Sequence, residues 1–391
     1  MSHRIYLDNA ATSFPKAPKV AAQMSDYLIM NGCNINRGGY HDSYSVEEKV
    51  FDCRFMLASL FGLNNSANVI FTRGVTESLN IAIRGLVGPQ DHVITSSLEH
   101  NAVVRTLFDV LEDSCESIST IPISECGDSL LDGLEQLIRS NSRAIIVTAA
   151  SNVCGTLVPL EQLGNFAEEH GLLFIVDAAQ SAGIVPIDME RMHIDVLCVS
   201  GHKGLMGPQG IGTMLLSDRV KDQVPPLITG GTGSFSDLEY MPKTLPDRLE
   251  AGTLNIPGII GLMQGVDFIR ETGIENIFEH EMKLTRHLLD GLIPLEEEGL
   301  LRIVGHRDTE NRIGVVSLAI NCMDASEAAF LLDENYGVET RVGLHCSPWA
   351  HRSLETFPEG TLRLSVGYFN SLDDVSIATD AVNMILHSNR K

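Results

Sequence analysis

The sequence predicts an α/β fold in which a large domain contains a mostly parallel sheet. Short apolar runs such as 144–148 and 172–176 alternate with helical stretches such as 159–169. Strands that alternate with helices are typical of βαβ units, and strands buried on both faces of a parallel sheet are apolar throughout. From about residue 275 the order of helices and strands changes, which predicts a smaller α+β domain at the carboxyl end.

The composition is that of a globular protein with room for two hydrophobic cores. The chain has 391 residues, of which 44% are hydrophobic and 20% are charged. Its formal net charge is −23, and it contains no run of Lys and Arg. Nucleic acids and anionic membranes select basic patches, so neither is an expected partner.

Three absences in the sequence bear on location and on metal binding. No apolar stretch approaches the roughly 20 residues that a membrane span needs. The first eight residues lack the apolar core of a signal peptide, so we expect a cytoplasmic location. The eight cysteines include no Cys-x-x-Cys pair, and we therefore expect neither a metal site nor a redox pair of that kind.

Short apolar runs bounded by polar or glycine-rich residues predict the strands. In the first part of the chain they lie at 68–72, 91–95, 144–148, 172–176 and 195–199. Helical patterns in the same part lie at about 45–60, 79–84 and 159–169. In the second part, strands at 315–320 and 361–365 are expected among helices at about 257–271, 279–292 and 326–334 and a terminal helix.

Polar residues follow most of the predicted parallel strands at their carboxyl ends. In open α/β sheets the ligand lies beyond these ends, so the residues are expected to meet at one edge. The set comprises Gly74, Thr76, His100, Asn152, Asp177, Gln180, Ser200, His202 and Lys203. This convergence indicates a ligand site more strongly than any single member does.

Lys203 is the central candidate in this set. It follows a buried strand through Ser200-Gly-His and precedes a glycine-rich loop. A lysine amine in a desolvated site, or beside a cation such as His202, is partly neutral near pH 7 and can act as a Schiff-base nucleophile. Taken alone, the motif favours a surface lysine near a turn, and it is the other sites in the chain that favour the catalytic interpretation.

Other candidates also have simple structural explanations. The glycine turn at Gly74 leads into a helix start, which can hold phosphate or can be an ordinary capped helix. His100 can cover a planar ligand or serve as a structural histidine. The polar segment 8–15 can line a cleft or form a plain loop. The glycine-rich stretches 207–212 and 230–233 lack the G-x-G-x-x-G spacing of dinucleotide sites.

An ordered set of motifs resembles a known family. The chain resembles the fold-type I pyridoxal-phosphate enzymes of aminotransferase class V, and among them the cysteine desulfurase and selenocysteine lyase group of the short-loop type. The resemblance covers nearly the whole chain. Its motifs are Tyr6-Leu-Asp-Asn-Ala-Ala11, Arg73-Gly-Val-Thr-Glu77, Glu99-His100, Ser151-Asn-Val-Cys-Gly-Thr156, Val176-Asp-Ala-Ala-Gln180, Ser200-Gly-His-Lys203, Glu250-Ala-Gly-Thr253 and Arg341-Val-Gly-Leu-His-Cys346.

The resemblance implies a two-domain architecture. Residues 16–260 would form a large domain that binds pyridoxal 5′-phosphate on a mostly parallel, seven-stranded sheet. Residues 1–15 and 261–391 would form the smaller α+β domain.

The resemblance also implies how five residues contact the cofactor. Lys203 would form a Schiff base with pyridoxal 5′-phosphate and later move protons. Asp177 would pair with the pyridinium nitrogen, which keeps the ring an electron sink. His100 would stack on the ring, while Gln180 and Asn152 would contact the phenolic oxygen and the substrate.

The remaining family positions concern the phosphate and the substrate. A cradle for the phosphate would consist of Gly74, Val75, Thr76, Ser200 and His202. In this family Gly252 and Thr253 reach the phosphate of the other subunit, which implies a homodimer with shared active sites. Arg363 would grip the substrate carboxylate, a task that suits a guanidinium fork.

Cys346 would be the sulfur acceptor. Its thiolate would take sulfur from L-cysteine, leaving a persulfide on the enzyme and releasing alanine, and the short loop resembles the type that passes sulfur to an acceptor protein. Selenocysteine lyase activity remains an alternative, as does another class V aminotransferase or β-lyase. A sulfur carrier or scaffold-binding protein without catalysis is a further alternative. Leu344, Ser347 and Leu254 depart from the usual family residues.

Overall fold

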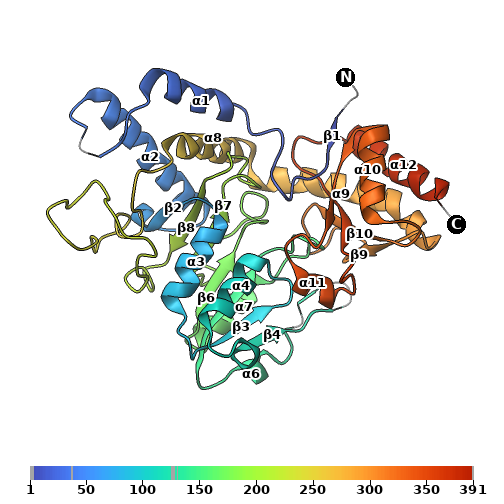
Figure 1. The fold of residues 1–391 in the computed structure, drawn as a ribbon, viewed down its shortest axis with the longest axis horizontal. Helices are drawn as coiled ribbons and strands as arrows, with labels where there is room; N and C mark the ends of the chain where they lie inside the picture. Colours follow the sequence, from blue (N-terminus) through green and yellow to red (C-terminus); the bar gives the residue numbers. More distant parts are fainter. Residues whose placement is uncertain (1–3, 37, 125–127, 130, 390–391) are drawn as a thin grey trace.

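The computed structural model describes residues 4–36, 38–124, 128–129 and 131–389; Cys126, one of the eight cysteines, lies outside this part. Its largest sheet has seven strands in the order β2-β8-β7-β6-β5-β3-β4 (Figure 1). Only β8 runs antiparallel to its neighbours, so the prediction of a mostly parallel, seven-stranded sheet is confirmed. In sheet order the strands are Val69–Thr72, Gly212–Leu216, Val196–Ser200, Leu173–Asp177, Ser142–Thr148, His92–Ser96 and Ile118–Ile121.

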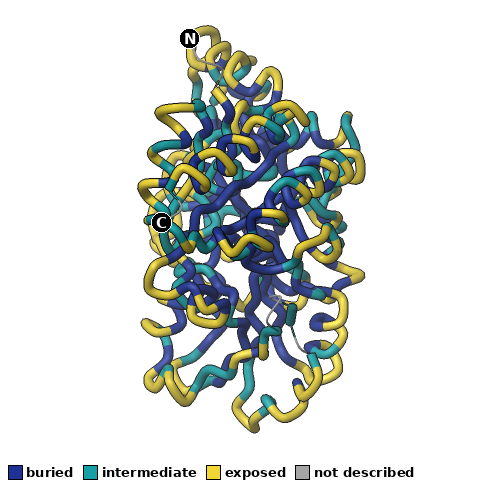
Figure 2. The backbone as a smooth tube through the Cα atoms, turned by 90° about the vertical axis from the view of Figure 1, so that its right-hand side faces the viewer, coloured by how far each residue is buried: buried dark blue, intermediate teal, exposed yellow. Residues whose placement is uncertain are grey.

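Both faces of this sheet are covered, because successive side chains of a strand point to opposite sides. One face packs against α3 (Val75–Leu86) and α4 (Asn101–Val110). The other packs against α2 (His41–Leu60), α7 (Leu160–Glu169) and α8 (Ile256–Thr272). Most strands of the sheet are therefore buried along their whole length, whereas the edge strand β4 is partly exposed (Figure 2). Helical elements at the margins are α1 (Val20–Asp26), the π-helix η1 (Tyr27–Asn31), the 3-10 helix η2 (Ser66–Asn68), α5 (Ser114–Ser117) and α6 (Leu134–Leu137).

A second hydrophobic core belongs to the carboxyl-terminal part of the chain. An antiparallel sheet in the order β12-β13-β10-β9 packs there against helices. Its strands are Arg341–Gly343, Thr361–Ser365, Val315–Ile320 and Leu301–Val304. The helices of this part are α9 (Ile274–Glu297), α10 (Ala325–Tyr336), α11 (Pro348–Ser353) and α12 (Leu372–Ser388).

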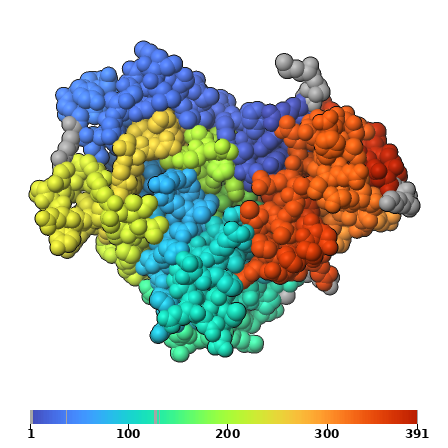
Figure 3. All heavy atoms as spheres, in the orientation of Figure 1, coloured from blue at the N-terminus to red at the C-terminus, as the bar shows by residue number. Residues whose placement is uncertain are grey.

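The amino-terminal segment contacts both parts of the molecule (Figure 3). Strand β1 (Ile5–Tyr6) pairs in parallel with β11 (Val338–Glu339) of the second part. A few residues later, the backbone N–H of Ser13 donates to the carbonyl of His202 at 3.0 Å, beside Lys203. Segment 8–13 thus lies between the two cores, in agreement with the cleft-lining alternative.

Most predicted elements are present, and the missed ones have local reasons. Strands 315–320 and 361–365 have the predicted bounds, whereas α9 is longer than the predicted 279–292. Strand β8 was missed because it begins inside a glycine-rich stretch that was interpreted as a loop. The strands β4 and β9 and the helices α4 and α11 were not predicted either. Among the described residues, no helix is long and apolar enough to span a membrane.

The division at residue 260 stays a prediction. Helix α8 packs against α1 and α2, and the core of the large sheet extends to Ile277. The second core begins on α9 at Leu284.

Candidate active site

Lys203 lies just beyond the carboxyl end of β7, as predicted. Burial lowers the pKa of its amine to about 8. The charges of Asp177 and Cys346 act in the opposite direction, and those of Arg363 and Arg341 lower the pKa further. These five groups interact electrostatically although they come from distant parts of the sequence. The structure therefore brings the predicted lysine, aspartate, arginine and cysteine into one site.

Asp177 ends the neighbouring strand β6 and is almost fully buried. Burial raises the pKa of its carboxyl. Two other effects lower this pKa: the backbone N–H of Ala179 donates to Oδ1 at 2.9 Å, and Lys203 contributes a nearby positive charge. An acidic group held in this way can pair with a cationic ring nitrogen of a ligand.

His100 is the residue before the first turn of α4. Its Nδ1 accepts a hydrogen bond from the backbone N–H of Ala102 at 3.0 Å, which places the proton of the neutral ring on Nε2. Burial, followed by the charge of Lys203, lowers the pKa of His100 to about 4. The imidazole is therefore neutral at pH 7 and can stack on a planar ring beside Lys203.

A set of donors without partners lies near the ends of β7 and β2. Ser200 Oγ and His202 Nδ1 are buried and have no hydrogen-bond partner within the described part of the chain. Burial lowers the pKa of His202 to about 4. Helix α3 begins after Gly74, and the first N–H groups of a helix have no partner within it. Orphaned hydroxyl, imidazole and backbone donors match the needs of a phosphate group.

The backbone packs closely behind this cradle. A Cβ atom at Gly212, the first residue of β8, would lie 2.6 Å from Cα of Gly74. A Cβ at Gly74 itself would meet nothing within 4 Å. Gly212 thus lets β8 approach the turn, and the open side of Gly74 leaves room for a ligand. The residues present fit pyridoxal 5′-phosphate.

Arg363, on β13, lies among polar partners. Its two terminal nitrogens donate to Oδ1 of Asp8 at 2.8 Å and to the carbonyl of Asn152 at 3.0 Å. Arg341 lies 3.9 Å from the other oxygen of Asp8. The Nε of Arg363 is buried and has no hydrogen-bond partner among the residues that the structure describes. Two guanidinium groups therefore share one carboxylate, and a net positive charge remains for a ligand carboxylate.

Cys346 is exposed and lies in a loop with unusual backbone geometry. His345 and Cys346 both have left-handed conformations, with φ of 46° and 59°, which non-glycine residues rarely adopt. The carbonyl of Cys346 accepts a hydrogen bond from the backbone N–H of Asn101 at 2.8 Å. The loop is thereby docked on the start of α4, next to His100.

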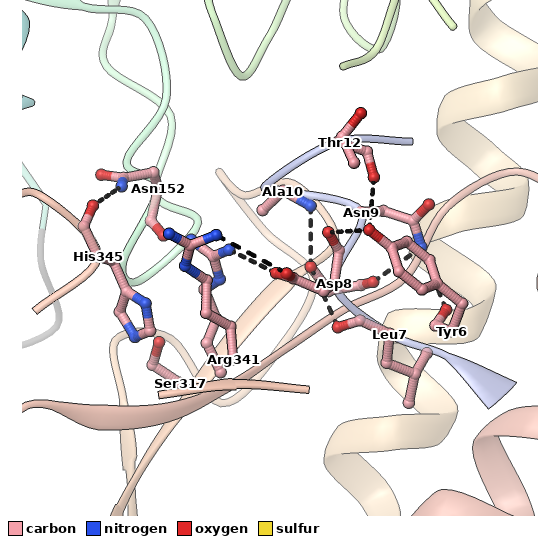
Figure 4. Close-up of polar contacts among 12 residues, drawn as sticks. Tyr6, Leu7, Asp8, Asn9, Ala10, Thr12, Asn152, Ser317, Arg341 and His345 are labelled. Carbon is pink, nitrogen blue, oxygen red and sulfur yellow. Dashed lines mark hydrogen bonds and ion pairs between the residues drawn. The ribbon is translucent and has the colours of Figure 1, made fainter. Parts of the chain in front are cut away.

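Two predicted contact residues are bonded within the protein. Gln180 donates through Nε2 to the carbonyl of Ala10 at 3.0 Å. Asn152 donates through Nδ2 to the carbonyl of His345 at 2.6 Å (Figure 4). Each amide nitrogen has a second hydrogen available for a ligand.

Gly252 and Thr253 border a cavity of their own. They line a cavity of about 820 Å³ together with Arg54 and Glu250, and Lys203 does not border it. Arg54 and Glu250 form a buried ion pair at 2.5 Å. Thr253 also lines a second pocket together with Thr72 and Arg73, beside the turn before α3.

Sequence reasoning assigned no role to Asp8, Lys16 or Glu99. Lys16 donates to the carbonyl of His202 at 2.8 Å, and burial lowers the pKa of its amine to about 8. Glu99, the residue before His100, is fully buried and accepts hydrogen bonds from the Ser96 hydroxyl and the Thr148 backbone N–H. For Asp8, the sequence did contain a signal. It is the acidic residue that begins the polar segment 8–15, shortly after the strand Ile5–Tyr6. No group of three or more His, Cys, Asp or Glu in the described ranges is arranged to hold a metal ion.

Comparisons with known proteins show the family to which this chain is related. The family described as aminotransferase class V matches residues 5–377. A probable cysteine desulfurase of Pyrococcus abyssi is 32% identical over 99% of this chain and 95% of its own length. One of Methanothermobacter thermautotrophicus is 31% identical over 97% and 94%. The apo structure of a cysteine desulfurase from Thermococcus onnurineus matches with a TM-score of 0.90 and 31% identity over 98% and 95%.

Proposed function

Because the chain belongs to the aminotransferase class V family, we propose that it is a pyridoxal-phosphate-dependent cysteine desulfurase that receives sulfur on Cys346. The observation that carries this proposal is the exposed thiol of Cys346 in the electrostatic neighbourhood of Lys203. Transamination would need the lysine but no thiol at this place. The expected cytoplasmic location is part of the same proposal.

The chain offers groups for each part of the cofactor. Pyridoxal 5′-phosphate, when bound, supplies an electron sink for the carbanion of an amino acid. Asp177 would pair with its ring nitrogen and His100 would cover its ring. The orphaned donors Ser200 Oγ and His202 Nδ1, with the start of α3, would hold its phosphate.

Lys203 is suited to nucleophilic attack and to proton transfer. Its pKa of about 8 leaves roughly one amine in ten neutral at pH 7. The neutral Nζ can attack a carbonyl carbon, and it can also carry a proton from Cα of the substrate to Cβ of the product. Arg363 and Arg341 would hold the substrate carboxylate, since one positive charge exceeds what Asp8 neutralises.

The sulfur step balances without an external oxidant. The thiolate of Cys346 forms a bond to Sγ of L-cysteine while the Cβ–Sγ bond breaks. The electron pair of that bond stays on Cβ, which takes up a proton and becomes the methyl group of L-alanine. A thiol and L-cysteine thus become a persulfide and L-alanine, and an acceptor protein would then collect the persulfide sulfur.

We include a homodimer with shared sites in the proposal. Gly252 and Thr253 line a cavity that Lys203 of their own chain does not border, which suits a role at the partner's phosphate. Large apolar side chains are exposed on η1 and α2, including Met30, Phe51 and Phe55. Apolar surface of this kind typically marks an interface between proteins.

The test compares alanine release from L-cysteine and from L-selenocysteine by the cofactor-loaded protein. Cys346→Ala is expected to abolish the cysteine reaction and to leave cofactor absorbance unchanged. Unchanged cysteine activity in this variant would contradict the role of Cys346. Selenocysteine turnover without any cysteine activity in the wild type would make the protein a selenocysteine lyase. Keto-acid turnover would indicate an aminotransferase, and failure to bind the cofactor would indicate a non-catalytic sulfur carrier.

A further inference from the structure

The side-chain amide of Asn152 is hydrogen-bonded to both residues that flank Cys346. Its Nδ2 donates to the carbonyl of His345 at 2.6 Å. Its Oδ1 accepts from the hydroxyl of Ser347 at 2.7 Å. Ser347 is fully buried, so this hydroxyl has no competing water. One amide therefore holds the Cys346 loop from both sides.

The chemistry of the two flanking groups determines how the Asn152 amide is oriented. A backbone carbonyl can only accept, so the amide nitrogen must face His345. The amide oxygen then faces Ser347, whose hydroxyl must act as the donor. With both bonds in place, a single N–H of Asn152 is left for a ligand. The His345 carbonyl thus sets which way the amide faces, and the Ser347 hydroxyl holds the amide oxygen in that position.

The loop needs such contacts because its backbone is held in a sparsely populated conformation. Two consecutive non-glycine residues, His345 and Cys346, have positive φ, and such residues persist where the surroundings hold them. The backbone N–H of Ser347 closes the turn by donating to the carbonyl of Leu344 at 2.8 Å. The remaining anchor at Cys346 itself is its carbonyl, bonded to Asn101.

We propose that Ser347 is a positioning residue that couples the placement of the Cys346 thiol to the orientation of the Asn152 amide. The inference rests on the proposed function, because it assigns these two groups to the sulfur acceptor and to the substrate contact. With the bond intact, the thiol and the free amide N–H occupy fixed positions relative to each other. Without it, the amide can rotate and the loop loses one of its two links to Asn152.

The first test needs no activity and no cofactor. The alkylation rate of Cys346 by iodoacetamide is measured by peptide mass spectrometry in cofactor-free protein, with the exposed Cys115 as an internal reference. Ser347→Ala is expected to accelerate alkylation of Cys346 about 5- to 10-fold, the effect of losing one hydrogen bond. Ser347→Thr keeps the hydroxyl and is expected to react within about twofold of the wild type. An unchanged or slower rate in Ser347→Ala would overturn the proposal.

A double-mutant cycle then separates coupling from general loosening. Asn152→Ala removes both bonds to the loop and is expected to accelerate alkylation more than Ser347→Ala does. If Ser347 acts through Asn152, the double variant reacts no faster than Asn152→Ala alone. Multiplicative effects of the two substitutions would show that Ser347 acts independently, which contradicts the proposal. Should Ser347→Ala fail to fold, the same cycle is run with Ser347→Gly.

The activity of the loaded enzyme gives a separate outcome. Ser347→Ala is expected to lower kcat for the cysteine reaction about tenfold, with KM and cofactor absorbance little changed, and Ser347→Thr is expected to restore it. If the wild type shows no cysteine reaction, the proposed function fails. The alkylation rates would then still decide whether Ser347 positions the loop.

Discussion

The carboxylate of Asp8 accepts a hydrogen bond from Arg363 at 2.8 Å, although the two residues are 355 positions apart in the sequence. Arg363 is almost fully buried, whereas Asp8 is partly accessible. Burial lowers the pKa of the guanidinium and Asp8 raises it, so the carboxylate keeps a buried cation charged. A substrate carboxylate would meet an arginine that already has one anionic partner.

Replacement of Asp8 tests this relationship. Asp8→Asn removes the charge but keeps the shape, and we expect a loss of about 2 kcal/mol in the free energy of unfolding, because Arg363 stays buried without an anion. In the variant, a ligand carboxylate can replace the lost charge. A carboxylate ligand such as L-alanine should therefore raise the stability of Asp8→Asn more than that of the wild type in urea denaturation of the cofactor-loaded protein.

The control for Asp8→Asn is Glu339→Gln, which removes the ion-pair partner of the exposed Arg4. Exposed ion pairs contribute little to folding stability, so we expect the free energy of unfolding to change by less than about 1 kcal/mol. Equal losses in the two variants, or equal stabilisation by the ligand in Asp8→Asn and the wild type, would contradict the role given to Asp8.

Gly212→Ala tests the close approach behind the phosphate cradle. A methyl group there would lie 2.6 Å from Cα of Gly74, so the turn before α3 must shift. We expect affinity for pyridoxal 5′-phosphate to fall at least about tenfold, since misplaced donors lose charge-assisted hydrogen bonds. The measurement is a titration of cofactor-free protein by visible absorbance. Gly39→Ala, where a Cβ meets nothing within 4 Å, should bind like the wild type.

Glu99→Gln tests a pH dependence of stability. Burial raises the pKa of Glu99 to about 8 from the ordinary 4.5. The carboxyl thus stays protonated in the folded state while the unfolded chain ionises. The stability linked to this proton is fully present below pH 4.5 and is lost as the pH rises towards 8. Glutamine cannot ionise, so the folding stability of the variant does not fall with rising pH for this reason.

Urea denaturation between pH 5 and 8 measures the effect of Glu99→Gln. The stability of the variant relative to the wild type should increase with pH, by up to about 1.4 kcal/mol per pH unit. A constant difference across this range would show that Glu99 is ionised in the folded protein. The exposed Glu359→Gln serves as the control.

Phe55→Glu tests the proposed homodimer. Phe55 is 60% exposed on α2, and a carboxylate there would be costly to bury in an apolar interface. We expect the variant to sediment as a monomer and to retain less cofactor, because each site would lose Gly252 and Thr253 of the partner. Phe330→Glu, at 62% exposure on α10, should remain a dimer. Dimerisation of both variants would refute this interface.

The sequence was sufficient to locate five of the seven strands of the large sheet, β2, β3, β5, β6 and β7. Strands buried on both faces are apolar throughout, and this local signal located β5, β6 and β7 and hence Asp177 and Lys203. Strand β8 was not predicted, because its first residue is Gly212 and glycine is typical of turns. Its requirement for glycine arises from the close approach of Gly74, a residue from another strand end.

By itself, the sequence determined which chemical groups this protein can use: a lysine, a cysteine, an aspartate and an arginine in the motif order of one family. The tertiary structure decided how they are linked. Asp8 pairs with Arg363, and Ser347 with Asn152, across distances in the chain that no local pattern spans. Hydrogen bonds and ion pairs depend on atomic separations of about 3 Å, and only the packing of the two cores sets those separations.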